Sequence, residues 1–414
     1  MTINNKNKNP NVPPLRFPEF TEKWEKYKVS DLLDFYSTNS LSWEQLEYGT
    51  EEILNLHYGL IHVGLPTMVD LSKDKLPNIK YGNNPKNYEL CKEGDIAFAD
   101  ASEDTNEVAK TIEFCNLDGK DVICGLHTIH GRDNKDITGV GFKGYAFSST
   151  AFHNQIRCIA QGTKIYSIST KNFSECYIGI PSKDEQAKIA SLLGLIDERI
   201  ATQNKIIDRL ESLIRGINQY AFTSKGVNYK LEELCEIRSG YSGNQLTSKN
   251  GLKVSRIETI SGHKVNMERV GYVAPFESSG NYRLQIGDIL FSNINSVEYI
   301  GNTAFIDKDY NLYHGMNLLR LTPNKKVVMP FYLYLLLNTN RMLNHFKTVC
   351  NKAVSQASIN QTELGKTVIR IPDLKAQKQI CELFQALYAK LESESYAISL
   401  LQNQKQHLLR QMFI

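Results

Sequence analysis

Four residues with metal-binding side chains lie close together in the first half of the chain. Cys115, Cys124, His127 and His130 fall within CNLDGKDVICGLHTIHG, and thiolate and imidazole groups are common zinc ligands. The spacing matches no common zinc module, and a buried strand cysteine with two histidines at a polar edge explains the stretch equally well. We therefore predict no metal site and no cofactor.

Acidic residues that follow glycine suggest a second kind of chemistry. Asp95 and Asp288 each stand between a glycine and a β-rich run, and Asp100, Glu103 and Asp104 add carboxylates near the first. Paired carboxylates can hold the metal ions of a nuclease. Gly-Asp before a strand is also a turn signature, because Asp bonds its own backbone there. We interpret these acids as structural.

The chain lacks the loops that common DNA-modifying or nucleotide-driven enzymes need. The nearest strings to the NPP[YF]-like or DPP[YF]-like loop of adenine methyltransferases are NVPP at Asn11 and NNPK at Asn83, and neither fits. A GxxxxGK[ST] phosphate loop and a GxSxG nucleophile elbow are both absent from the sequence. We predict that the chain is not an enzyme and that partners supply any catalysis.

Composition indicates a two-domain protein. The 414 residues exceed one ordinary core, and the net charge of +3 leans only weakly toward anionic partners. The eight cysteines form no CxxC pair, and the polar, proline-broken N-terminus lacks an apolar targeting segment. The longest apolar run, near FYLYLLL, is too short for a bilayer. We expect a cytoplasmic protein with reduced thiols and no membrane contact.

The elements that must position any site occur twice. IGIPSKDEQAKIASLL (178–193) returns as IRIPDLKAQKQICELF (369–384), with Pro181 and Pro372 at equivalent places. Earlier in each half, EGDIAFADA is echoed by IGDILFSNI, and KYKVSDLLDF by NYKLEELCEI. Since the order of the anchors is kept while the sequence between them differs, the chain reads as a duplicated scaffold with two divergent inserts.

Each half ends in a predicted long helix with a heptad seam. The seam residues alternate in steps of three and four, which favours helices packed along their length over a helix lying on one core. They are Ile189, Leu193, Ile196, Ile200, Ile207, Leu210, Ile214, Ile217 and Ala221, then Ile380, Phe384, Leu387, Leu391, Ile398, Leu401, Leu408 and Met412.

Polar residues mark the starts and the middles of these helices. Ser182 with Glu185 predicts a capping box, and Asp373 takes the equivalent N-cap position. Gln203 and Glu394 interrupt the two seams at equivalent positions. If the helices run antiparallel, we expect this polar pair to fix the coiled-coil register.

In this plan the chain resembles the specificity subunit of type I restriction–modification enzymes. The resemblance rests on the Gly-Asp-Ile strand motifs and on both long helices. It also rests on the two Ile-Pro motifs that precede these helices, with Gln186 and Gln377, which we call the launch motifs. It covers nearly the whole chain. The second launch carries Ala376 where the first has Glu185, which predicts altered contacts at that end.

The resemblance implies fold, partners and function. The expected fold is α+β: two target recognition domains, each with a mixed or antiparallel sheet and helices, joined by two long antiparallel coiled-coil helices in a pseudo-twofold repeat. The expected partners are double-stranded DNA, two modification (methyltransferase) subunits and restriction (nuclease-translocase) subunits. Each half would read one part of a bipartite asymmetric target, directing adenine methylation and restriction. The segments are a flexible lead 1–14, domains 15–181 and 225–372, and helices 182–224 and 373–414.

Residue chemistry and position alone select the expected DNA contacts. Phosphates favour Lys and Arg, and base edges favour Arg, Asn, Gln, Ser and Thr in loops. His127 and His130 could also lie near DNA. The predicted contacts are Arg132, Lys143, His153, Asn154, Gln155, Arg157, Tyr241, Asn244, Lys249, Asn250, Arg256, Asn293, Asn295, Lys352, Ser355 and Gln356.

Two other functions fit parts of the sequence. One is a self-contained DNA nuclease or methyltransferase with an atypical active site, which activity of the purified chain alone would reveal. The other is a two-lobed scaffold that binds only proteins through its helices. A salt-dependent, sequence-selective DNA footprint would exclude the scaffold.

Overall fold

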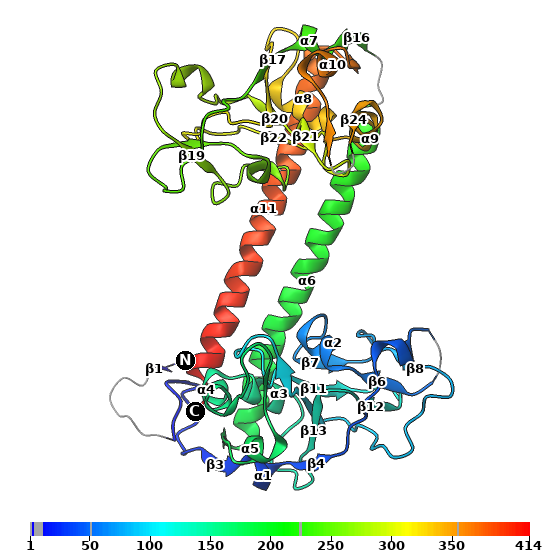
Figure 1. Ribbon diagram of the computed structural model, residues 1–414. Helices are drawn as coiled ribbons and strands as arrows, with labels where there is room; N and C mark the ends of the chain where they lie inside the picture. The colour runs from blue at the N-terminus through cyan, green and yellow to red at the C-terminus, as the bar shows by residue number, and fades with distance from the viewer. Residues whose placement is uncertain (1, 4–10, 50–51, 223–225, 354–355) are drawn as a thin grey trace. The chain divides into compact units, whose positions relative to one another are not determined.

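The structure is a computed structural model that describes residues 2–3, 11–49, 52–222, 226–353 and 356–414. Contacts divide the chain into two compact units. The first unit comprises Met1–Lys205 and Tyr396–Ile414, and the second comprises Ile206–Ser395. Each unit therefore contains one globular half of the chain and a section of both long helices (Figure 1).

The first unit is built on a mixed five-stranded sheet. Its strand order is β4 (Asp34–Tyr36), β13 (Thr128–Arg132), β9 (Ile96–Ala99), β11 (Thr111–Asn116) and β7 (Met68–Asp70). Only the β11–β7 pair is parallel. A second sheet, which we call the insert sheet, has the order β12 (Val122–Cys124), β6 (Leu54–Leu56), β8 (Asn78–Ile79) and β5 (Leu46–Glu47).

Strand pairs and short helices complete the first unit. The pairs are β1 (Thr2–Ile3) with β2 (Leu15–Arg16), β3 (Glu25–Lys28) with β15 (Tyr177–Ile180), and β10 (Ala101–Ser102) with β14 (Tyr166–Ser167). The helices are α1 (Val29–Leu32), α2 (Tyr58–His62), α3 (Lys143–Phe147), α4 (Thr150–Ile159) and α5 (Thr170–Ser174), with a 3-10 turn at Trp43–Gln45.

The second unit repeats the scaffold with a different insert. Its antiparallel sheet has the order β17 (Cys235–Ser239), β23 (Leu319–Pro323), β20 (Ile289–Phe291) and β22 (Thr303–Phe305). The smaller sheets are β16 (Val227–Lys230) with β26 (Val368–Ile371), β18 (Leu252–Val254) with β19 (Gly271–Val273), and β21 (Ile294–Asn295), β25 (Ala357–Ser358) and β24 (Asn351–Lys352). The helices are α7 (Leu231–Leu234), α8 (Pro330–Leu337), α9 (Asn340–Val349) and α10 (Gln361–Gly365), with 3-10 turns at Ile257–Ile260 and Ser279–Tyr282.

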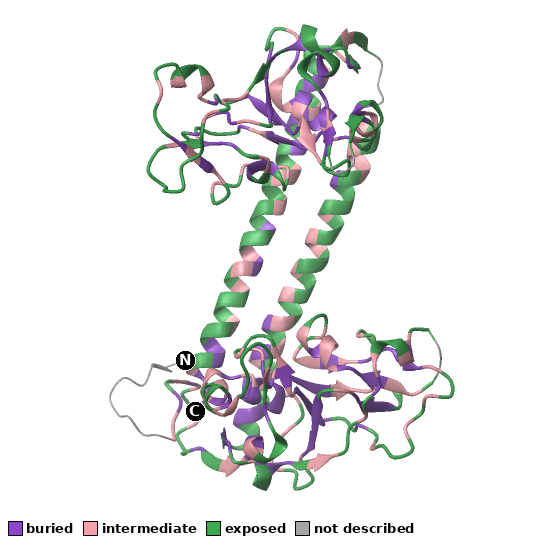
Figure 2. Cartoon of the chain, in the orientation of Figure 1, coloured by how far each residue is buried: buried purple, intermediate pink, exposed green. Residues whose placement is uncertain are grey.

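The two long helices are α6 (Lys183–Ala221) and α11 (Leu374–Gln411). In the first unit the start of α6 packs with the end of α11, as Leu193 and Leu408 share one core. In the second unit the end of α6 packs with the start of α11, as Ile214 and Phe384 share another. The helices are therefore antiparallel, and the predicted α+β fold with a paired-helix repeat is confirmed. Figure 2 shows buried residues within the sheets and at the helix ends, with exposed faces along both helices.

Candidate nucleic-acid interface

The repeated glutamine of the launch motif fixes each long helix to its own globular half. Gln186 is buried: its Oε1 accepts the N–H of Gly139 at 2.7 Å, and its Nε2 donates to the carbonyls of Ile137 and Pro181 at 3.2 and 2.9 Å. Satisfying three backbone groups at once locks the helix start onto the domain, because unpaired buried groups are costly.

Gln377 makes the same contacts in the second unit. Its Oε1 accepts the N–H of Met329 at 2.8 Å, and its Nε2 donates to Val327 and Pro372 at 3.2 and 2.9 Å. Asp373 caps this helix, since its Oδ1 accepts the N–H of Ala376 at 2.8 Å. The repeated sequence thus encodes one clamp that orients each domain on its helix.

Glu185 departs from its predicted capping role. Its two carboxylate oxygens accept from Arg16 Nε and Nη2 at 2.7 and 2.6 Å, and Trp24 Nε1 donates to the same group at 3.2 Å. Glu185 is 1% exposed and Arg16 is 8% exposed. The carboxylate of Glu185 therefore binds the N-terminal segment, and Ala376 at the equivalent position of the second launch motif has no side chain that could make these hydrogen bonds.

The two Gly-Asp acids lie in buried turns, as predicted. Asp95 and Asp288 each accept, at 2.8 Å, the backbone N–H of the third residue before them, Lys92 and Gln285. Asp95 also binds Arg132. Although burial opposes ionisation, the hydrogen bonds that Asp95 accepts hold its pKa below the usual value.

Two predicted DNA contacts lie inside the first unit and are corrected here. Arg132, 6% exposed, donates to Asp95, to Glu89 and to a backbone carbonyl. Lys143, 3% exposed, pairs with the buried carboxylate of Glu113 at 3.1 Å. Because both cations balance buried carboxylates, neither is available to a phosphate group.

Helix α4 carries four predicted contacts with different surroundings. Gln155 exchanges two hydrogen bonds with the backbone of Tyr177, at 2.7 and 2.9 Å, and so ties α4 to β15. Asn154 and Arg157 are exposed and hydrogen-bond each other. His153 is half-buried, with its Nδ1 buried and unpaired, and burial lowers its pKa.

A basic groove lies beside α4 within the first unit. It encloses about 360 Å³, and its charged lining residues are Lys110, Arg157, Lys405 and Glu107, with His153 beside them. Lys405 of α11 pairs with Asp197 of α6 at 2.6 Å. Sequence reasoning missed Lys110, which directly precedes β11, and Lys405 of α11 as lining residues, because both are far from Arg157 in the sequence and only the tertiary structure brings them to it.

Five of the predicted contacts lie in residues 240–285 of the second unit, which we call the basic lobe. The segment holds six Lys or Arg against three Glu, so its net charge of +3 equals that of the whole chain. Asn244, Lys249, Asn250 and Arg256 are exposed, as is Lys253, which the prediction missed. A surface of this sign attracts polyanions.

An aromatic cluster supports the start of the basic lobe. Tyr241 stacks on Phe276 with ring centroids 3.9 Å apart and planes 6° apart, and Tyr282 meets both rings edge-on. All three side chains are half-buried. Tyr241 is thus an anchor of the lobe with one part of its ring at the surface.

The remaining predicted contacts gather on the three-stranded sheet of the second unit. Asn295 lies in β21, Lys352 in β24, and Gln356 directly precedes β25, which pairs with both strands. Lys352 and Gln356 are exposed. Asn293 precedes β21, and its Oδ1 is buried and unpaired. Ser355 lies outside the described residues.

His314 makes the backbone beneath the basic lobe sensitive to acid. It is 1% exposed, its Nε2 lies 3.0 Å from the carbonyl of Leu318, and its own carbonyl accepts the N–H of Tyr241 at 2.9 Å. Burial lowers its pKa to about 4.

We expect the second unit to lose stability as the pH falls from about 6.5 to 4. In this window the unfolded histidine binds a proton and the folded one does not, so acidification favours unfolding by about 3 kcal/mol. Calorimetry at pH 7 and 4.5 should show the loss. His314→Gln, which cannot titrate, should flatten this pH dependence. Equal pH dependence in the two proteins would contradict the prediction.

The polar interruptions of the two seams differ in environment. Glu394 is 9% exposed and pairs with Lys390 of the same helix, whereas Gln203 is half-buried. Gln203 belongs to the first unit and Glu394 to the second. Their pairing as a register device stays a prediction.

Both long helices carry exposed leucines, and these occur in both units. Leu195 and Leu400 are 62% and 50% exposed in the first unit, and Leu213 and Leu383 are 49% and 46% exposed in the second. Leu195 and Leu213 belong to α6, and Leu383 and Leu400 belong to α11. No helix in the described ranges combines the length and hydropathy needed to span a membrane.

Known proteins are similar to this chain in sequence and in fold. The family model for the type I restriction modification DNA specificity domain matches residues 74–212 and 224–401. A protein of Methanocaldococcus jannaschii, provisionally assigned as the specificity subunit of the type I restriction enzyme MjaX, is 40% identical over 188 residues, 44% of each chain. The EcoKI specificity subunit of Escherichia coli K12 is 25% identical over 277 residues, 60% of this chain and 58% of that protein. The chain thus spans about half the length of the curated relatives it matches.

Solved structures agree in fold. The S subunit of a type I restriction–modification system from M. genitalium has a TM-score of 0.57 at 16% identity, covering 97% of this chain and 99% of that one. A chain from work on complex assembly and conformational transition of the type I system has a TM-score of 0.60 at 17% identity, covering 96% and 98%. With two family matches that span most of the sequence, this chain belongs to the type I restriction–modification DNA specificity family.

Proposed function

We propose that this chain is the DNA-recognition subunit of a type I restriction–modification complex. Each globular half reads one part of a bipartite, asymmetric target, and the paired helices set the spacer between the parts. The chain itself is not an enzyme. It directs adenine methylation by two modification subunits, and restriction by nuclease-translocase subunits that join them, in the cytoplasm.

The single observation that carries this proposal is that the same scaffold occurs twice, attached to its long helix in the same way, and bears a different insert each time. Gln186 and Gln377 fix each half to a long helix by the same three hydrogen bonds. The inserts differ: the first is a four-stranded sheet and the second is the basic lobe with one strand pair. A scaffold that is the same in both halves but carries two different inserts suits the recognition of two different half-sites.

The partner proposal rests on the exposed leucines of both long helices. These residues occur in each unit, so each unit has exposed apolar side chains on its sections of the two long helices. Two modification subunits, one on each unit, would cover these side chains and remove them from water.

Mapping N6-methyladenine tests the proposal. The gene is expressed with its modification-subunit gene in a host that lacks adenine methylation, and genomic DNA is sequenced by a method that detects the modified base. We expect one bipartite motif, lost when this gene is omitted. Replacing residues 240–285 with the equivalent segment of another family member should change one half-site and leave the other.

Two outcomes would contradict the proposal. Methylation that persists without this gene would remove its recognition role. Methylation or cleavage by the purified chain alone would instead support a self-contained enzyme.

A further inference from the structure

Three ligand atoms converge inside the first unit, although the sequence grouped them differently. Cys124 in β12 and His130 in β13 are joined by Cys91, and their ligand atoms all lie within 4.8 Å of one another. All three residues are buried. Cys115 and His127 lie elsewhere: Cys115 donates to the carbonyl of Val69, and His127 is exposed and pairs with Asp100.

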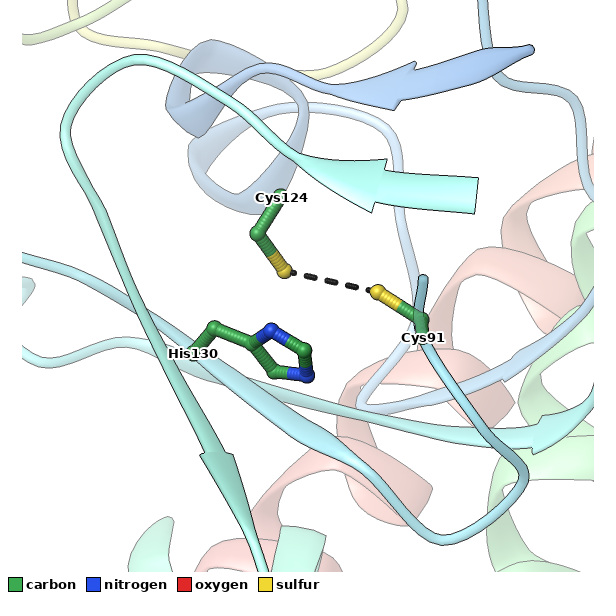
Figure 3. Close-up of side chains that lie close together, drawn as sticks. All are labelled: Cys91, Cys124 and His130. Atoms are coloured by element: carbon green, nitrogen blue, oxygen red, sulfur yellow. Dashed lines mark hydrogen bonds between the residues drawn. The ribbon is translucent and has the colours of Figure 1, made fainter. Parts of the chain in front are cut away.

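The two sulfur atoms have a separation that suits tetrahedral coordination. Cys91 Sγ and Cys124 Sγ are 3.6 Å apart (Figure 3). An ion about 2.3 Å from both sulfurs would form an S–metal–S angle of roughly 103°, close to the tetrahedral value of about 109°. A linear two-coordinate ion with the same bond length would need sulfurs roughly 4.6 Å apart.

His130 offers a lone pair to the same space. Its Nε2 is 2.8 Å from Asp95 Oδ2, and Asp95 is held as a carboxylate by Arg132. Because a carboxylate accepts, Nε2 carries the hydrogen, so a neutral ring that ligates a metal ion would offer its lone pair on Nδ1. Nδ1 is buried without a hydrogen-bond partner, and Figure 3 shows this nitrogen on the side of the two sulfurs.

The pair of Asp95 and His130 is the arrangement that orients metal-bound histidines. A carboxylate that accepts from the distal ring nitrogen fixes the tautomer and raises the basicity of the ligating nitrogen. Two thiolates would also balance a divalent cation, so binding would place no net charge in the core.

We propose that Cys91, Cys124 and His130 bind one zinc ion through Sγ, Sγ and Nδ1. These side chains supply three ligands, and a water molecule would complete the tetrahedron. The ion would tie β12 of the insert sheet to β13 of the five-stranded sheet and to the chain before β9.

The second unit provides an internal comparison. Strand pairing places Leu290 opposite Arg320 as it places Ala97 opposite His130, so Arg320 occupies the position of His130. Counting back from Asp288 as from Asp95 places Leu284 where the first unit has Cys91. The ligand set is therefore specific to the first unit and is not repeated at the equivalent positions of the second.

Metal analysis of the full chain tests this site. Purified under reducing conditions without chelator, the wild-type protein should contain about one zinc per chain, and Cys115→Ser should contain the same. Cys124→Ser and His130→Asn should each lose at least tenfold in zinc occupancy at equal protein concentration. Circular dichroism identifies any variant that fails to fold.

If the variants misfold, cobalt substitution in the wild-type protein tests the site without them. Removing zinc from the wild-type protein with a chelator and adding Co²⁺ should give the visible bands of a tetrahedral site with thiolate-to-cobalt charge transfer. Failure of the wild-type protein to retain zinc or take up Co²⁺ would overturn the proposal. A Cys91–Cys124 disulfide in the freshly purified protein, or equal zinc loss in Cys115→Ser, would also overturn it.

Discussion

Removing three cations from the basic lobe should weaken DNA binding by the assembled complex by about a hundredfold or more. The variant is Lys249→Ala, Lys253→Ala and Arg256→Ala, all at exposed positions. Each lost phosphate contact removes a released counterion, so the slope of log affinity against log salt should fall by up to about 3. Fluorescence anisotropy of a labelled target duplex measures the affinity and its salt dependence. The titrations would run from about 50 to about 200 mM salt, where this dependence is large.

A matched variant separates local contact from total charge. Lys366, Lys375 and Lys378 are exposed residues of the same unit outside the basic lobe. Their triple substitution by alanine changes the net charge equally and should leave affinity within about threefold, since dispersed exposed charges are largely screened. Equal losses in the two triple variants would contradict a role for the lobe.

Breaking the buried pair of Glu185 and Arg16 should destabilise the first unit by about 3–5 kcal/mol. In Glu185→Ala the Arg16 guanidinium loses two hydrogen bonds of 2.7 and 2.6 Å while it stays buried. Both tryptophans of the chain, Trp24 and Trp43, belong to the first unit, so their fluorescence follows its unfolding. Urea titration of that signal gives the free energy of unfolding.

A second acid near the same helix start serves as control. Glu19 pairs with Lys188 at the surface, and Glu19→Ala should leave the urea midpoint of unfolding nearly unchanged, because exposed ion pairs contribute little. The double variant Arg16→Met, Glu185→Leu should recover much of the lost stability, since it leaves no unpaired buried charge. An equal cost for Glu19→Ala and Glu185→Ala would show that the pair is not buried.

The fold could be predicted from the sequence because it depends on local patterns of residue types that occur twice along the chain. The heptad seams required long paired helices, and the ordered recurrence of the Gly-Asp and Ile-Pro motifs required two equivalent scaffolds. Gln186 and Gln377 were visible as equivalent residues, and their identical hydrogen bonds explain the recurrence. In the basic lobe, exposure agrees with the choice of Asn244, Lys249, Asn250 and Arg256.

Tertiary structure alone decided which polar side chains are available. Arg132 and Lys143 have the same chemistry as surface cations, and only the fold reveals the buried carboxylates that occupy them. Glu185 finds Arg16 across 169 positions, and Cys91 joins Cys124 across 33. The sequence by itself determined the elements, whose periodicity is local. Strand pairing and packing determined the partners, because these bring together residues whose separation along the chain carries no information about their distance in space.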